Sequence, residues 1–249
     1  MRYLYLALLV SIITIAGCSS QKLNTPVTAS DYYQRGERFL NKKDYLKAIE
    51  AFRTITTNFP GSDLVDDAQY GLGEAYFRSG EYSSAISEYE KLSREYPLSG
   101  YVEKAQFRIG QCYLRQSLPA QLDQENTYRA LERFNRFIQE YPDSDLIPQA
   151  RQKILQCRTK LAEKDYLNGR LYARLRAFDA ALYYYQKVVD QFGETKWSAL
   201  AQLEIGEILL KQGKKDQALR AFQRALASSS DKKLKKRALQ RIKKIGEDK

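Results

Sequence analysis

The hydrophobic positions of residues 32–60 follow the period of an α-helix twice in succession. The first set is Tyr32, Gly36 and Phe39, and the second set is Ala48, Phe52 and Ile55. Members of each set lie three or four residues apart, so each set forms one face of a helix. Pro60 then ends the second helix. The stretch therefore predicts two helices that pack against each other through these faces.

This pair of helices recurs along the chain. A glycine in the first helix is followed twelve residues later by an alanine in the second, and four residues after that by an aromatic residue. The glycine and alanine pairs are Gly36 and Ala48, Gly73 and Ala85, Gly169 and Ala181, and Gly206 and Ala218. The pattern resembles the tetratricopeptide repeat (TPR), and we expect the glycine of each pair to face the alanine where the two helices cross closely.

The middle of the chain follows the same pattern with two insertions. The third unit opens at Gly110, but its Ala130 arrives eight residues late, which predicts an inserted loop over residues 117–124. We expect Ala120 in this loop to tolerate a larger side chain. No Pro or Gly interrupts residues 149–168, so the fourth unit should begin with an extended helix of about eight turns.

The sequence therefore predicts an all-α protein. Five TPR-like helix pairs would stack as a right-handed α-solenoid, since no single pair buries enough apolar surface to fold alone. Units one to three occupy residues 31–142, and units four and five occupy residues 143–249 together with a C-terminal capping helix.

The beginning of the chain has the features of a lipoprotein signal peptide. A basic Arg2 precedes an apolar run that is short for a transmembrane helix. Ile15-Ala16-Gly17-Cys18 resembles the lipobox of bacterial lipoproteins, in which the cysteine carries the lipid. We predict a signal peptide over residues 1–18, lipidation of Cys18, a flexible tether over residues 19–30 and a location on the periplasmic face of the outer membrane.

The positive charge of the chain is concentrated at its C-terminus. The net charge is +11, and residues 232–249 contribute nine basic and two acidic residues. The apolar residues Leu234, Ala238, Ile242 and Ile245 form one stripe along this segment. The stripe predicts an amphipathic helix that caps the core of the last unit. Binding of its basic face to an acidic partner or to anionic lipid head groups stays open, whereas secretion excludes nucleic acid as a partner.

The composition gives no sign of catalysis. The chain contains no histidine, which removes the commonest general base and metal ligand. It also lacks a glycine-rich phosphate loop and the CxxC and GxSxG motifs. Cys112 and Cys157 are expected as buried free thiols. We therefore predict a binding scaffold rather than an enzyme, without a cofactor or a metal site.

The binding surface of such a solenoid is its concave face, which the first helix of each pair lines. Positions three before and four after each packing glycine are expected to face this groove. The candidates are Tyr33, Tyr70, Phe77 and Phe107, accompanied by Arg78 and Arg115. Aromatic side chains with guanidinium groups suit an extended peptide that carries apolar side chains and a carboxylate. The alternative, that these aromatic residues belong to the core, stays open.

One stretch of the chain resembles a known family. Within residues 123–195, the motif YPDS at 141–144, the run KLAEKDY at 160–166 and the aromatic-rich fourth unit are similar to the BamD family (also called ComL or YfiO). This family consists of lipoproteins of the outer-membrane β-barrel assembly (BAM) machine. The resemblance covers nearly the whole mature chain.

The resemblance implies a non-enzymatic subunit. Its N-terminal repeats would receive the C-terminal targeting segment of unfolded barrel proteins, and its last two repeats would dock on the POTRA domains of BamA. Other BAM lipoproteins are further candidate partners. Where the family often carries an arginine in unit four, this chain has Tyr183, Tyr184 and Tyr185, so an aromatic contact would replace a charge pair in docking.

Two other functions fit the same architecture. A TPR partner of the Tol system usually has a coiled-coil N-terminus and no lipid, and Cys18 and the absence of heptads argue against it. A lipoprotein scaffold for peptidoglycan-synthesis partners is not separated from the first interpretation by sequence.

Overall fold

The computed structural model of the protein describes residues 27–247, and every regular element in this range is an α-helix. The helices are α2 (Ala29–Asn41), α3 (Tyr45–Asn58), α4 (Val65–Ser79), α5 (Tyr82–Glu95), α6 (Val102–Gln116), α7 (Glu125–Glu140), α8 (Ile147–Arg174), α9 (Phe178–Gln191), α10 (Lys196–Lys211), α11 (Lys215–Ser228) and α12 (Lys232–Glu247). The predicted signal peptide, Cys18 and most of the predicted tether lie outside the described residues. The first helix begins at Ala29, inside the predicted tether, because Thr28 caps it through a reciprocal hydrogen-bond pair with Asp31.

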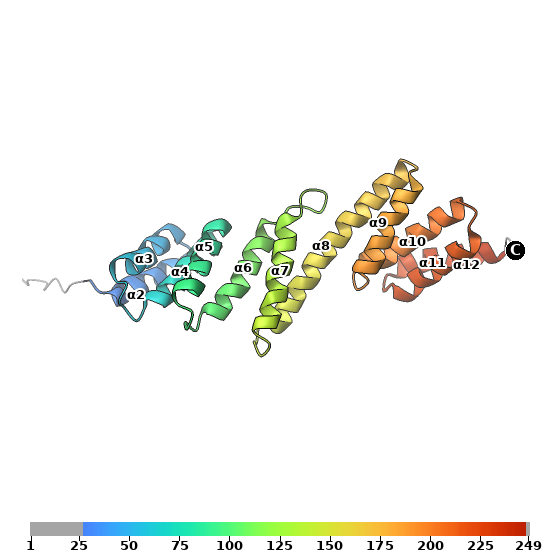
Figure 1. Cartoon of the computed structure of the whole chain (residues 1–249). Coiled ribbons are helices and arrows are strands. Elements are labelled where there is room, and N and C mark those ends of the chain that lie inside the picture. The colour runs from blue at the N-terminus through green and yellow to red at the C-terminus, as the bar shows by residue number, and fades with distance from the viewer. Residues whose placement is uncertain (1–26, 248–249) are drawn as a thin grey trace, which may run out of the picture.

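The helices α2 to α11 form five consecutive pairs, and each helix packs on the next one along the chain. Figure 1 shows them as an elongated stack with α2 at one end and α12 at the other. The predicted all-α solenoid of five TPR-like pairs with a C-terminal capping helix is confirmed. None of the helices described between residues 27 and 247 is long and apolar enough to cross a membrane.

The packing glycines lie against aromatic rings. A Cβ atom added to Gly73 would lie 2.5 Å from Cε1 of Tyr89, and one added to Gly36 would lie 2.6 Å from Cε1 of Phe52. The same relation holds for Gly110 with Phe134, Gly169 with Tyr185 and Gly206 with Phe222. The expectation that each glycine faces the alanine of its pair is therefore corrected. The ring one turn after the alanine occupies the space that the missing side chain leaves.

Helix α8 joins the two halves of the solenoid. Its 28 residues confirm the predicted long helix, which spans about 42 Å at ~1.5 Å per residue. Near its beginning, Ala150 and Cys157 belong to a core cluster with Phe134 of α7. Further along, Leu161 and Tyr166 belong to the core that α8 shares with α9 and α10. The long helix therefore passes from one hydrophobic cluster to the next, and Figure 1 shows it running from α7 to α9.

The loop over residues 117–124 is present where the sequence predicts it, but it is folded onto the protein. The amide of Gln124 is buried and donates to the carbonyl oxygen of Pro119 at 2.8 Å. From α8, Lys160 Nζ donates to Ser117 Oγ at 2.7 Å. Ala120 is only 5% exposed, so its burial argues against the expectation that it tolerates a larger side chain.

Helix α12 closes the far end of the stack. Its side chains Leu234, Ala238 and Ile245 are buried in one cluster with residues of α10 and α11. The predicted capping role of this helix is confirmed, because its apolar stripe covers core that the last pair would otherwise expose.

Candidate functional site

A cavity of about 420 Å³ lies between α6 and α8, beside the end of α4. It is lined by Phe77, Arg108, Gln111, Leu114, Arg115, Ser117, Lys153, Gln156 and Lys160. Four of these residues are cationic and none is acidic. We call it the basic cavity. Its composition suits a ligand that combines an anionic group with an apolar side chain.

Two helix faces form most of this cavity. Arg108, Gln111 and Arg115 follow each other on α6 at spacings of three and four residues, so they share one face. Lys153, Gln156 and Lys160 do the same on α8. The long first half of α8 therefore contributes a row of side chains to the cavity, in addition to its packing on α7.

A buried carboxylate organises one wall of the cavity. Glu74 of α4 is 4% exposed and accepts hydrogen bonds from Arg108 Nε at 2.5 Å and from Tyr89 Oη at 2.7 Å. Burial opposes the charge of Arg108, but Glu74 outweighs it and raises the pKa of Arg108. The Arg108 guanidinium also lies over the ring of Phe77, 4.9 Å from its centroid. Arg108 is therefore held in place by a carboxylate and a ring.

Two hydroxyl groups beside Glu74 remain neutral donors. Burial raises the pKa of Tyr89 far above its usual value, and the charge of Glu74 adds to this effect. Burial, followed by the charge of Glu74, also raises the pKa of Tyr70 to about 12. Both phenols therefore keep their protons at neutral pH, and the negative charge of this wall is confined to Glu74.

The remaining cations of the cavity are less engaged. Within residues 27–247, Arg115 and Lys153 have no acidic side chain as an ion-pair partner. Lys160 donates to the hydroxyl and the carbonyl oxygen of Ser117, and burial lowers the pKa of Lys160. The cavity thus presents positive charge that Glu74 does not compensate.

The structure separates the arginines predicted to line the groove. Arg115 lines the basic cavity, whereas Arg78 is directed to Glu74, with 3.6 Å between its Nη2 and the carboxylate. Arg78 does not line the cavity. An incoming carboxylate would therefore meet a cation at Arg115 that has no acidic partner in the described chain, and at Arg78 one that is already paired.

The predicted aromatic residues are divided as well. Phe77 lines the cavity, but Phe107 is 4% exposed and packs edge-on against Phe134 and Phe137 of α7, so its ring is core. Tyr70 is stacked on Tyr101, with 4.6 Å between ring centroids. Tyr33 is half-buried, and its ring lies edge-on to Phe52 at 5.7 Å. Only Phe77 among the four therefore lies in the basic cavity.

Sequence reasoning missed the residues of α8. Lys153, Gln156 and Lys160 precede the glycine of unit four by more than a full turn, so the repeat pattern gave them no role. Their spacing of three and four residues on an uninterrupted helix was the available signal. What was missing was the knowledge that this face of α8 lies opposite α6.

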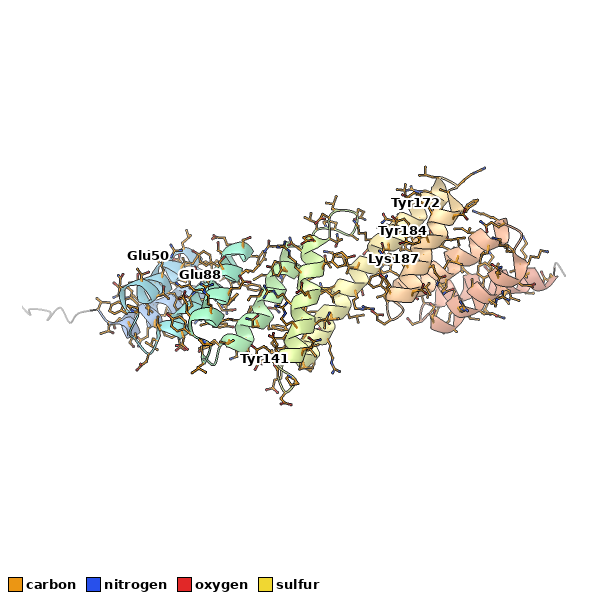
Figure 2. The ribbon with its side chains drawn as sticks, viewed as in Figure 1. Glu50, Glu88, Tyr141, Tyr172, Tyr184 and Lys187 are labelled. Carbon is orange, nitrogen blue, oxygen red and sulfur yellow. The ribbon has the colours of Figure 1, made fainter. Side chains whose placement is uncertain are left out.

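The three tyrosines predicted for docking have three different environments. Tyr185 is 1% exposed and lies in the core on Gly169. Tyr184 is stacked on Tyr172, with 5.5 Å between the ring centroids (Figure 2). Tyr183 is 65% exposed and lines a second cavity, of about 630 Å³, between α9, α10 and α11. Of the three, Tyr183 has the most exposed side chain.

This second cavity is more apolar than the first. Leu182 and Tyr183 of α9 and Leu209 of α10 contribute its apolar side chains, and Asp179 and Asp190 contribute negative charge. Lys187, labelled in Figure 2, also lines the cavity. It forms an ion pair of 3.0 Å with the buried Asp165 of α8. We call this second cavity the α9–α11 cavity.

Metal ligands are the remaining question for these cavities. In the part of the chain between residues 27 and 247, no group of three acidic or thiol side chains could hold a metal ion. The stacked pairs, with a cationic cavity at α6 and α8 and a more apolar one at α9 to α11, define a helical-repeat protein of the TPR type.

Comparison with known proteins gives the family. The family model described as YfiO, outer membrane lipoprotein, matches residues 26–221, so the chain belongs to this family. A relative is the outer membrane protein assembly factor BamD of Rickettsia prowazekii (strain Madrid E), which is 25% identical over 214 residues, or 85% of each chain. The family resemblance in the sequence is confirmed.

Solved structures of repeat proteins are also similar. The TPR2AB domain of yeast Sti1, in a complex with pHSP90, is 18% identical, with coverage of 87% of this chain and 82% of that chain and a TM-score of 0.46. A TPR repeats protein of Bacteroides fragilis is 13% identical, with coverage of 86% and 98% and a TM-score of 0.49.

Proposed function

We propose that this chain is a non-enzymatic, lipid-anchored scaffold in the assembly of outer-membrane β-barrel proteins. In this proposal its basic cavity receives the C-terminal segment of an unfolded barrel protein, and its last two units dock on the POTRA domains of a BamA-type barrel. Membership of an outer membrane lipoprotein family supports the setting, as does the relative named as an assembly factor. The composition of the basic cavity supports the choice of ligand.

The ligand is argued from the cavity wall. A C-terminal carboxylate is an anion that a guanidinium group binds through two parallel hydrogen bonds, and Arg115 is available for it. Lys153 adds a second positive charge from the opposite helix. The apolar side chains of the same segment would lie on Phe77 and Leu114. The unpaired cations of this cavity, rather than Arg78, are the observation that carries the proposal.

The test is a fluorescence titration of the protein with a peptide copied from the C-terminus of a barrel protein. We expect a dissociation constant that is micromolar or weaker, on the order of 10⁻⁶ M or above, because a flexible peptide loses conformational entropy on binding. Arg115→Ala and amidation of the peptide carboxylate should each weaken binding. Their effects should not add, since both remove the same charge-assisted contact.

Arg78→Ala is the matched control. It removes an arginine from the same region that Glu74 already engages, so peptide affinity should change little. Full additivity of Arg115→Ala with amidation, or a larger effect of Arg78→Ala, would reject Arg115 as the carboxylate anchor.

Docking is proposed at the α9–α11 cavity, with Tyr183 as its exposed aromatic side chain. In a pull-down with the full lipidated protein, Tyr183→Ala should reduce recovery of a POTRA-containing barrel protein. Leu98→Ala, which removes a side chain that is 99% exposed in the loop between α5 and α6, should not. Recovery of Tol or peptidoglycan-synthesis proteins in place of a POTRA-containing barrel would contradict the proposed function.

The lipid anchor is proposed at Cys18. The thiol is the acceptor for the lipid, so Cys18→Ser should leave the protein uncleaved and without lipid. Mass spectrometry of the membrane fraction checks this. A Cys18→Ser protein that still matures to a lipidated outer-membrane form would show that the lipobox is misassigned.

A further inference from the structure

The outer face of α12 is a dense patch of positive charge. Its exposed lysines are Lys232, Lys233, Lys235, Lys236, Lys243 and Lys244. Lys232, Lys235, Lys236 and Lys243 line a shallow depression together with Leu239 and Gln240. These positions recur every three or four residues, so they share the side of the helix turned away from the core. We call the side of α12 formed by Lys232, Lys235, Lys236, Leu239, Gln240 and Lys243 the lysine face.

Within residues 27–247, the arginines of α12 form ion pairs with the neighbouring helix, whereas its lysines do not. Arg241 Nε lies 2.7 Å from a carboxylate oxygen of Glu207, and Arg237 Nη2 lies 3.7 Å from Glu204, so both arginines pair with α10. In the described part of the chain, the only ion pair of a lysine in this helix joins Lys243 to Glu247 at 3.7 Å, and both of these side chains are exposed. Capping therefore uses the arginines and the apolar stripe, and leaves the lysine face without a role in the fold.

The composition of this face indicates the kind of partner. A lysine ammonium is a hydrated point charge on a flexible stem, which suits a diffuse field of negative charge better than a fixed, planar recognition site. Leu239 stands among the lysines with 53% of its surface exposed. Lysine stems around an exposed apolar side chain are typical of a helix that lies on a membrane surface, with its ammonium groups at the lipid phosphates.

We propose that the lysine face of α12 binds the surface of a membrane that contains anionic lipids. The chain belongs to a family of outer membrane lipoproteins, so a membrane surface is within its surroundings. Charge complementarity favours anionic lipid head groups, because each lysine near such a surface adds electrostatic attraction. The contact is independent of the peptide ligand proposed for the basic cavity.

The position of α12 gives this contact a consequence. Figure 1 shows α12 at the end of the stack opposite α2, the helix that follows the predicted tether. A lipid anchor before α2 and a lysine face on α12 would hold both ends of the stack at a membrane. The elongated body would then lie along the membrane surface rather than project from it.

The test uses the full lipidated protein in vesicles. A fluorophore is attached through Gln240→Cys, since Cys112 and Cys157 are buried, and energy transfer to an acceptor lipid is measured. On vesicles with phosphatidylglycerol, transfer should be about twofold or more above that on phosphatidylcholine vesicles, because anionic lipid attracts the lysines. The excess should disappear in about 1 M salt, where the Debye length falls to ~3 Å.

Matched variants separate this face from net charge. The test variant combines Lys232→Gln, Lys236→Gln and Lys243→Gln, and it should abolish the excess transfer. The control variant removes three exposed charges elsewhere, through Lys42→Gln, Arg151→Gln and Arg174→Gln, and it should retain the excess. A third variant combines Lys232→Arg, Lys236→Arg and Lys243→Arg; it keeps the positive charge and should also retain the excess transfer.

Three outcomes would overturn the proposal. One is equal transfer on both kinds of vesicle, and another is an equal loss in the test and control variants. The third is transfer that depends on an added barrel protein rather than on anionic lipid, which would assign the lysine face to a protein partner. The anchor does not confound these outcomes, because every variant carries the same N-terminal segment.

Discussion

Glu74 of α4 and Arg108 of α6 form a bidentate ion pair between the second and third units, with N–O distances of 2.5 and 3.0 Å. Counted from the packing glycines, the same two positions in units four and five are Arg170 and Glu204, with the charges exchanged. There Glu204 lies 3.7 Å from Arg237 of α12 instead. The repeat thus places charged side chains at the same positions in these units, but the ion-pair partners of these side chains differ from one pair of units to another.

The ion pair leads to a prediction for stability. Glu74→Gln should lower the free energy of unfolding by on the order of 3 kcal/mol, because it leaves the partly buried Arg108 without its carboxylate. Glu90→Gln is the control, since the Glu90 side chain, which pairs with Arg133 at 2.8 Å, is 43% exposed. It should cost less than about 1 kcal/mol. Urea denaturation measures both, and similar losses would contradict the distinction between a buried and an exposed pair.

The packing of glycine on aromatic rings makes a second prediction. Gly73→Ala places a Cβ 2.5 Å from the Tyr89 ring, and that ring is held by the hydrogen bond from its hydroxyl to Glu74. We expect a loss of about 1 to 3 kcal/mol from overpacking. Gly100→Ala meets no atom within 4 Å and should be close to neutral. Thermal melts of the two variants check this, and equal shifts would be inconsistent with the glycine register.

The folded loop gives a third prediction. Ala120→Leu should destabilise the protein by about 1 to 3 kcal/mol, because Ala120 is buried where the loop meets the protein. The fully buried Ala85 should respond to the same substitution in a similar way. The exposed Ala227 on α11 is the control and should tolerate leucine. A neutral Ala120→Leu in a melting experiment would show that the loop is not packed as described.

Thiol reactivity gives a fourth prediction, with a pH dependence. Burial raises the pKa of Cys112 to about 12 and that of Cys157 to about 12. The thiolate is the reactive form and its fraction falls tenfold per unit below the pKa, so roughly one in 10⁴ is ionised at about pH 8. Neither should react with a thiol reagent in the native protein, and reactivity should rise as the pH approaches this pKa.

The measurement is a thiol titration before and after unfolding. If Cys18 carries the lipid, the mature protein should show no reactive thiol when folded and two when denatured. Rapid labelling of the native protein near neutral pH would contradict the burial of these residues, and a third thiol in denaturant would contradict lipidation of Cys18.

Much of the fold could be predicted from local sequence. The glycine and aromatic spacing, the late Ala130 and the unbroken helix before Gly169 each report on a single helix or on one helix pair. Such pairs contact their neighbours in order along the chain, so local pattern and tertiary arrangement agree in a repeat protein. For this reason the sequence alone predicted the solenoid, the inserted loop, the long helix and the capping helix.

The site was decided by side-chain contacts that the spacing of residues along the chain does not specify. Phe77 and Phe107 both stand at predicted groove positions, yet the rings of Phe134 and Phe137 on α7 make Phe107 core. Glu74 engages Arg78 and leaves Arg115 available.

The sequence by itself determined the helical repeats, the register of their packing glycines and the family, because these depend on spacings of three, four and twelve residues within the chain. Only the tertiary structure brought the lysines of α8 to the cavity at α6 and buried Ala120 where its loop folds onto the protein. The physical reason is that the exposure and charge environment of a side chain depend on the neighbouring helix, whereas helical periodicity depends only on the helix to which the side chain belongs.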